Sequence, residues 1–240
     1  MTKQQKSEGS ALTTETESNF LALQGADNAI LAAVQEFGLD KSLLTRIKVP
    51  AGGGQFWEIE TAAGVESEKT LEAIVVSANL RSRAWFRLAP EDAGDSTAPD
   101  CTSADGITGM GNPSPDEAKE PGSHECASCP FAQWGSDRRE GGRGQDCSVR
   151  GSLVVFIPQV AMPVIVSIPR TSIKSFQKYA MQLAGSRLHP AGVVTALTLQ
   201  KKQSGGNSYS VIEFRQSREV SPDELERITG LKETLSAAFG

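Results

Sequence analysis

Apolar residues recur at regular spacings in two blocks of the 240-residue chain. In the first block, "QFWEIET" alternates apolar and polar positions and "TLEAIVVSANL" is a longer apolar run, which predicts two strands. In the second block, "SLVVFIP" and "PVIVSIP" predict neighbouring strands whose prolines mark their ends. "GVVTALTLQKK" and "NSYSVIEFRQ", joined by "QSGG", predict a β-hairpin.

Helical spacing predicts three helices around these strands. Residues 19–37 carry Leu, Ala and Ile at three- and four-residue intervals. The segment "TSIKSFQKYAMQLAG" has an apolar stripe, and its Thr or Ser can cap the first turn. The last helix is expected after Ser221, with Pro222 at its first position and Glu224 as the returning residue of a capping box.

Residues 89–149, between the two blocks, are dense in Gly, Pro, Asp and Ser and have almost no apolar periodicity. A compact domain rarely contains so long a loop unless something other than a hydrophobic core orders it, and a metal would do so. The predicted fold class is therefore α+β, mainly antiparallel β, with an OB-like barrel core, an inserted four-cysteine zinc subdomain and flanking helices. The predicted parts are a disordered leader (1–18), an N-terminal helix and first core strands (19–88), a zinc-binding insertion (89–149), the second half of the core (150–218) and a C-terminal helix (219–240).

The chain's four cysteines all lie in this insertion. Cys126 and Cys129 form a C-x-x-C pair, whose two thiolates can both reach one tetrahedral ion at about 2.3 Å. Cys101 and Cys147 lie on either side and complete a four-thiolate set, so we expect a structural zinc site with no open position for catalysis. His124, just before the C-x-x-C pair, is a reserve ligand.

Other uses of the cysteines are weighed against zinc. An iron–sulfur cluster also takes four thiolates, and the sequence does not exclude it, although zinc is favoured. Disulfides are disfavoured, because the polar N-terminus lacks the apolar core of a signal peptide and thiols stay reduced in the cytoplasm. The apolar runs are too short and too broken by proline to span a bilayer, so the expected location is the cytoplasm, without membrane contact.

Charge is distributed unevenly along the chain, whose net charge is −5. Residues 150–218 contain nine Lys and Arg against the single acid Glu213, a local excess of +8. Such a basic block in an acidic protein is a candidate surface for a polyanion, although charge runs are often only solvated faces. Lys174 and Lys178 fall four residues apart, on the side of their helix opposite the apolar stripe.

The segment "ANLRSRAWFRL" predicts a strand with one basic and aromatic face. Alternate residues of a strand share a face, which groups Arg81, Arg83, Trp85 and Arg87. Single-stranded nucleic acid is held by cations that contact phosphates and by rings that stack on bases. The alternative is that the tryptophans are core residues and the arginines pair with acids across the sheet. The predicted nucleic-acid-binding residues are Arg81, Arg83, Trp85, Arg87, Trp57, Arg150, Lys174, Lys178, Lys201 and Lys202, with Phe131, Trp134 and Tyr209 as further candidate platforms.

No catalytic motif emerges from the sequence. The two histidines, His124 and His189, lie in neither a Ser/His/Asp nor an H-E-x-x-H context. The glycine-rich "AGGGQ" lacks the Lys-Ser/Thr of a phosphate-binding P-loop and is expected to be a turn. We therefore expect a protein that is not an enzyme.

Several segments together resemble a group of phage, prophage and mobile-element proteins of about this length: "LLTRIKVPAGGGQFWEI", "PDCTSADGITGMG", "CASCPFAQWGS", "GRGQDC" and "IPRTSIKSFQKYAMQL". The resemblance covers about residues 43–215, and its cysteine block is the specific part. In organisation the group is similar to phage single-stranded DNA-binding, helix-destabilising proteins, some of which carry a zinc subdomain. The resemblance implies an OB-like core that binds single-stranded DNA in replication or recombination within a bacterial host cell, with proteins of those processes as partners. The alternative function is a zinc-ribbon adaptor of transcription or the replisome, whose partner is a protein.

Overall fold

The structure is a computed structural model that describes residues 32–34, 36–38, 43–88, 98–114, 121–138, 142–204 and 206–239. The predicted leader at 1–18 lies outside these residues. So does most of the helix predicted at 19–37, of which residues 32–34 and 36–37 are helical.

A six-stranded sheet forms the centre of the molecule, in the order β1-β11-β10-β4-β12-β13. All neighbours in it are antiparallel except β1 and β11, which are parallel. Each of the four strands and the hairpin predicted from apolar patterning is present. The strands of this sheet, with the separate β2–β3 hairpin, are β1 (Arg46–Ile47), β2 (Trp57–Thr61), β3 (Gly64–Glu68), β4 (Thr70–Asn79), β10 (Gly151–Ile157), β11 (Val160–Ile168), β12 (Val193–Ser204) and β13 (Asn207–Glu219).

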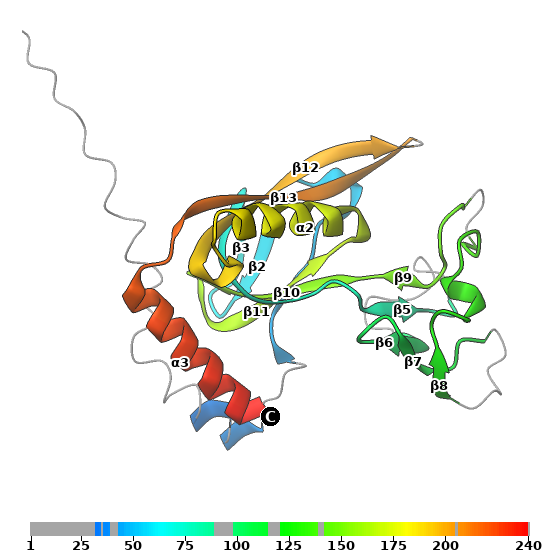
Figure 1. The fold of residues 1–240 in the computed structure, drawn as a ribbon, viewed down its shortest axis with the longest axis horizontal. Helices are drawn as coiled ribbons and strands as arrows, with labels where there is room; N and C mark the ends of the chain where they lie inside the picture. The colour runs from blue at the N-terminus through cyan, green and yellow to red at the C-terminus, as the bar shows by residue number, and fades with distance from the viewer. Residues whose placement is uncertain are drawn as a thin grey trace, which may run out of the picture.

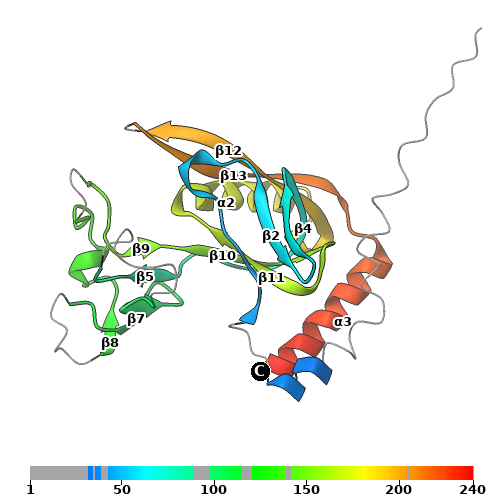
Figure 2. The same ribbon diagram turned by 180° about the vertical axis from the view of Figure 1, so that it is seen from behind.

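The two faces of this sheet contact different helices: one lies along the sheet and the other lies at one end of it (Figures 1 and 2). Leu71 and Val75 of β4 point to one face, where they join a large apolar cluster with β2 and with helix α2 (Arg170–Gly185). Ile74, between them, points to the other face and packs with helix α3 (Pro222–Phe239). Alternation along a strand therefore divides a single run of apolar residues between two cores.

The predicted α+β class with mainly antiparallel strands is confirmed. The sheet is open rather than a closed barrel, because its two edge strands, β1 and β13, do not pair with each other among the described residues. Helix α2 packs its buried Ile173, Phe176 and Leu183 onto the face that a barrel would enclose with further strands. Alternation in the sequence indicates that a strand has a buried face, but it does not reveal whether a strand or a helix covers that face.

The predicted capping box begins helix α3. The Glu224 carboxylate accepts a hydrogen bond from the backbone N–H of Ser221 at 2.9 Å, and the Glu224 N–H donates to the Ser221 hydroxyl at 3.3 Å. Arg218, at the end of β13, donates to both carboxylate oxygens of Glu224, which is only 2% exposed. These contacts fix the turn from the sheet edge into the helix.

A second, five-stranded sheet has the order β8-β7-β6-β5-β9, and its strands are β5 (Arg83–Trp85), β6 (Cys101–Ser103), β7 (Thr108–Gly111), β8 (Gly122–Glu125) and β9 (Ser148–Val149). We call the described residues from Arg83 to Val149 the cysteine lobe; it lies at the opposite end of the molecule from α3 (Figures 1 and 2). The chain enters it from β4 and leaves into β10, and Ser82 and Arg150 close this neck with hydrogen bonds of 2.7 and 2.8 Å. Across the described part of the chain, no helix combines the length and apolarity needed to cross a membrane.

Candidate functional site

The four cysteines converge in the cysteine lobe although they are far apart in the sequence. Cys101 opens β6, Cys126 follows β8, Cys129 precedes the short helix η4 (Pro130–Ala132), and Cys147 precedes β9. All four are free thiols and all are buried. They line one small cavity of about 10 Å³, which is roughly the space of a single water-sized sphere.

The thiols in this cavity influence one another electrostatically. Burial, reinforced by the nearby Cys147, Cys129 and Cys126, raises the pKa of Cys101 to about 11. Burial also raises the pKa of Cys147, and the Arg83 guanidinium opposes this rise. Because metal ligands must be deprotonated thiolates, a cation that binds here has to displace protons.

His124 lies at the edge of the same cavity. Its Nε2 is 3.5 Å from the sulfur of Cys101, and the neighbouring strand provides Gly109 directly beneath the imidazole. A Cβ atom at Gly109 would overlap the ring, so only glycine leaves room for the histidine there. The structure thus brings the reserve ligand beside the four sulfurs.

The donor set suits zinc, because four buried thiols with an adjacent imidazole are the ligands that zinc takes in closed structural sites. The side-chain positions do not form a finished cage. Within the described ranges, no group of three or more His, Cys, Asp or Glu side chains is placed to hold a metal ion. The residues therefore fit zinc in chemistry and burial, and zinc binding itself stays a proposal.

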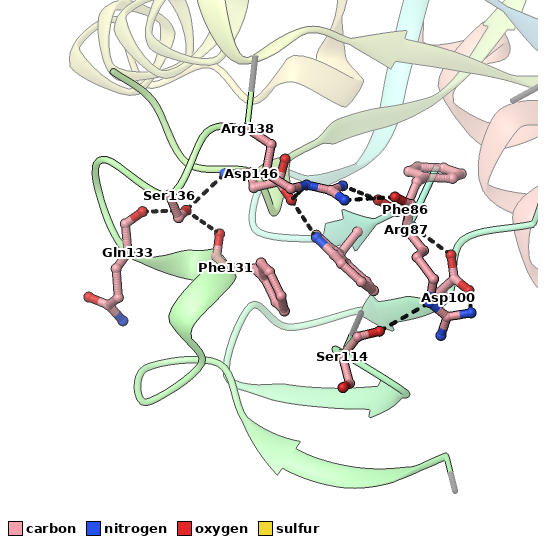
Figure 3. A network of polar contacts seen from close by, with 10 residues as sticks. Phe86, Arg87, Asp100, Ser114, Phe131, Gln133, Ser136, Arg138 and Asp146 are labelled. Atoms are coloured by element: carbon pink, nitrogen blue, oxygen red, sulfur yellow. Dashed lines mark hydrogen bonds and ion pairs between the residues drawn. The ribbon is translucent and has the colours of Figure 1, made fainter. Parts of the chain in front are cut away.

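Aromatic rings complete the lobe interior, and a network of polar contacts adjoins them (Figure 3). The Trp85 ring stacks on Phe131 with centroids 4.5 Å apart, and its Nε1 donates to Asp146 at 2.6 Å. Arg138 donates to the same carboxylate at 2.7 Å and also to the backbone carbonyls of Phe86 and Arg87. Asp146 thus connects a buried ring to a charged side chain that fastens the end of β5.

The predicted basic and aromatic face of residues 81–87 requires correction. Trp85 is 1% exposed, and Arg83 lines the cysteine cavity beside it, so this face points into the lobe. Arg87 forms an ion pair with Asp100 at 3.3 Å and donates to the Ser114 carbonyl. Arg81 alone of the row is exposed. The lobe has few aliphatic residues, so it buries the indole in their place. Arg87 pairs with an acid and a carbonyl of distant segments, and Arg83 lies against Cys147.

Trp57 is likewise unavailable to a nucleic-acid base. It is completely buried in the main core, and its Nε1 donates to the Leu197 carbonyl at 3.0 Å. The alternation of "QFWEIET" already places Trp57 on the same side as Ile59, which is also fully buried. The core-residue alternative therefore holds for both Trp57 and Trp85.

The central sheet and α2 carry a separate basic surface. Arg170, Lys174 and Lys178 are exposed at four-residue intervals along α2, and we call them the basic stripe. Lys178 also lines an open cleft of about 790 Å³, to which β12, β13 and the residues before β4 contribute. The cleft brings Lys178 together with Lys69 and Arg215, against the single acid Glu213.

The remaining predicted cations occupy three different places. Lys202 is exposed on β12, two residues beyond Gln200, which lines the cleft, so both belong to one strand face. Lys201 points to the other face, where its stem lies over Gly53. The Arg150 guanidinium lies 5.1 Å from the centroid of the Phe86 ring at the neck of the lobe.

Sequence reasoning missed part of this surface. Lys69 and Arg215 reach the cleft because β4 and β13 flank β12 in the sheet. No local sequence motif predicts that strand pairing. Arg170 belongs to the basic block but was not among the predicted binding residues. Trp134, which the sequence offered only as a further candidate platform, is 70% exposed, unlike the two buried tryptophans.

No family model, no curated protein and no solved structure matches this chain. The resemblance to phage single-stranded DNA-binding proteins therefore remains a prediction.

Proposed function

We propose that this protein binds single-stranded DNA through the basic stripe and the adjoining cleft, and that it does so without catalysis. The main support for this proposal is that three exposed cations on α2 lead into an open cleft that holds two more, Lys69 and Arg215. Within the described residues, none of Lys69, Lys174 and Lys178 forms an ion pair with an acidic side chain. These charges remain available to a polyanion.

The composition of the cleft favours a flexible polar chain over a small apolar ligand. Polar side chains line most of it, including Gln55, Gln182 and Gln200, while Tyr179 and Phe214 are the aromatic residues of the lining. Cations that track phosphates give affinity without sequence preference, and each phosphate contact releases counterions. An open, basic and polar cleft is suited to this mode of binding. Such binding does not require the sheet to close into an OB-like barrel.

We propose further that Cys101, Cys126, Cys129 and Cys147 hold a structural zinc ion, with His124 as a neighbour of the site. Bound zinc would supply a cross-link between three segments of the lobe: β6, the turn after β8 and the segment before β9. Other side chains stabilise the lobe as well: Trp85 and Phe131 stack in its interior, and Asp146 and Arg138 hydrogen-bond next to the end of β5. Metal analysis together with the visible spectrum tests the assignment, because an iron–sulfur cluster would be coloured and zinc would not.

The DNA-binding proposal is tested by fluorescence anisotropy with labelled oligothymidylate over a series of salt concentrations. Affinity should fall as salt rises, and K174Q and K178Q should each reduce the magnitude of the log–log slope by about 0.7, the value per phosphate on single strands. K232Q, an exposed lysine on α3, is the matched control and should leave the slope unchanged. Absence of binding by the unaltered protein at low salt would refute the proposal.

A protein partner for the cysteine lobe is the second candidate function. Ile107 and Met110 on and beside β7 are 65% and 58% exposed, which gives the lobe an apolar outer surface. A zinc-ribbon adaptor would use such a surface and would show no salt-dependent affinity for oligothymidylate. The same titration therefore separates the two candidates.

A further inference from the structure

The three tryptophans of the chain lie in contrasting environments. Trp57 and Trp85 are 0% and 1% exposed, and each has a hydrogen-bond acceptor for its Nε1. Trp134 is 70% exposed, and its Nε1 forms no hydrogen bond with the described part of the molecule. The lobe therefore buries one indole as core and presents another to solvent.

The backbone around Trp134 is firmly held despite this exposure (Figure 3). The Gln133 side chain donates to the Ala127 carbonyl at 2.7 Å, and the Ser136 hydroxyl contacts the carbonyls of Phe131 and Gln133 at 2.9 and 2.7 Å. Gly135, at φ +87°, turns the chain and donates to the Gly144 carbonyl at 2.8 Å. A ring on so ordered a turn is already positioned for contact, which reduces the entropy lost on binding.

Trp134 also lies at one end of the basic stripe. The Arg170 Cζ atom is 4.5 Å from the centroid of the indole ring, so the first cation of the stripe sits over it. From Arg170 the stripe runs two helical turns to Lys178 at the cleft, a rise of roughly 12 Å. The lobe thus supplies a ring at the point where the core begins its row of cations.

We propose that Trp134 is a base-stacking residue, and that the cysteine lobe places it beside the phosphate-binding stripe of the core. The inference rests on the proposed binding of single-stranded DNA. A nucleobase stacks on the indole, the Arg170 guanidinium contributes a cation–π contact and a phosphate partner, and Lys174 and Lys178 hold the phosphates that follow. The two regions then form one binding surface, and loss of order in the lobe weakens DNA binding.

Tryptophan fluorescence during titration with unlabelled oligothymidylate tests the inference directly. Stacking on Trp134 should quench the emission of the exposed indole, while the buried Trp57 and Trp85 serve as internal references. W134A should weaken binding roughly 5- to 150-fold, the range that corresponds to loss of one stacked base. W134F keeps a flat ring and should retain most of the affinity while losing the quenching signal.

F37A is the matched control, because Phe37 is an aromatic side chain with the same 70% exposure and no place in the cleft or the stripe. It should bind like the unaltered protein. If the unaltered protein binds oligothymidylate but W134A binds equally well and no quenching occurs, the inference fails and the proposed function stands. If the unaltered protein does not bind at all, both fail. A thermal melt of W134A and W134F, matched to the unaltered protein, establishes that any loss comes from the ring and not from unfolding.

Discussion

The central sheet and the cysteine lobe are stabilised by different physical means. The sheet buries aliphatic side chains on both faces, and many of them, including Leu153, Val164 and Leu197, have no exposed surface. The buried cluster of the lobe consists of three cysteines, one tryptophan and one alanine, with Phe131 packed against it. Since apolar burial stabilises roughly in proportion to area, the lobe has far less of it to offset chain entropy.

The lobe compensates with specific polar contacts and, we propose, with a metal cross-link. Asp146, Arg138, Arg87 and Asp100 join segments that share only the small buried cluster of the lobe. Such contacts depend on each partner being present, because a partly buried charge that loses its partner is costly. Single substitutions in the sheet should therefore lower its stability gradually. In the lobe, removing one connection should be enough to cause loss of order.

The largest effect is expected from the double substitution C126S/C129S. It removes two of the four proposed ligands, and structural zinc sites contribute about 10–16 kcal/mol of binding free energy. Bound metal should be lost, and hydrogen exchange should lose protection across the lobe while β10–β13 keep theirs. Retention of metal, or equal loss of protection in the sheet, would contradict the proposal that a metal cross-link stabilises the lobe separately from the sheet.

Truncating the main core should cost less and should spare the lobe. Leu197→Ala leaves a cavity among fully buried side chains, so the free energy of unfolding should fall by about 2–5 kcal/mol in a urea titration. Metal content should not change. M181A, on an α2 residue that is 74% exposed, is the control and should shift the free energy by less than about 0.5 kcal/mol. A similar loss from both variants would contradict the assignment of Leu197 to the core.

Within the lobe, D146N tests the hydrogen bonds of the Asp146 carboxylate without changing the size of the side chain. The amide weakens the bonds to the Trp85 Nε1 and to Arg138, which should cost the lobe about 2–3 kcal/mol. Exchange protection should fall between β5 and β9 and stay unchanged in α2. Unaltered protection of the lobe would mean that this network contributes little.

The smallest of these effects concerns α3 and depends on pH. Hydrogen bonds from Arg218 and Ser221 hold the pKa of Glu224 below its usual range. The stability that Glu224 contributes is therefore complete above the unfolded-state pKa of about 4.3 and is lost as pH falls through the lower folded value. At neutral pH, E224Q should be less stable by about 1–2 kcal/mol. The difference should shrink as pH falls below about 4. A difference independent of pH would contradict the ionic origin of this contribution.

The strands of the central sheet were well predicted from the sequence, because each strand is indicated by the pattern of its own neighbouring residues. Alternation in "QFWEIET" and the apolar runs at 153–158 and 163–169 correspond to β2, β10 and β11, and the capping residues placed the start of α3. Closure of the sheet was not predictable in this way, because covering of the inner face by α2 is a long-range choice. The same applies to Lys69 and Arg215, which share a cleft through strand pairing.

The sequence predicted the lobe in part. The four cysteines that the spacing grouped as metal ligands line one cavity, and their binding of zinc stays a prediction. The orientation of residues 81–87 was wrong, because the partners of Trp85 and Arg87 lie at Asp146 and Asp100, in segments without periodicity. Period-based reasoning assumes an aliphatic interior, and a lobe whose interior is made of thiols and rings breaks that assumption.

The central claim is that the stripe on α2, the cleft beside it and Trp134 together bind one strand of DNA. Ultraviolet cross-linking of the full chain to oligothymidylate, followed by peptide mapping, tests it most directly. Cross-links are expected in the peptide that contains Trp134 and in peptides from α2 and β13, with none in α3. Cross-links confined to α3 or to the outer strands β7 and β8, with none at Trp134 or α2, would contradict it.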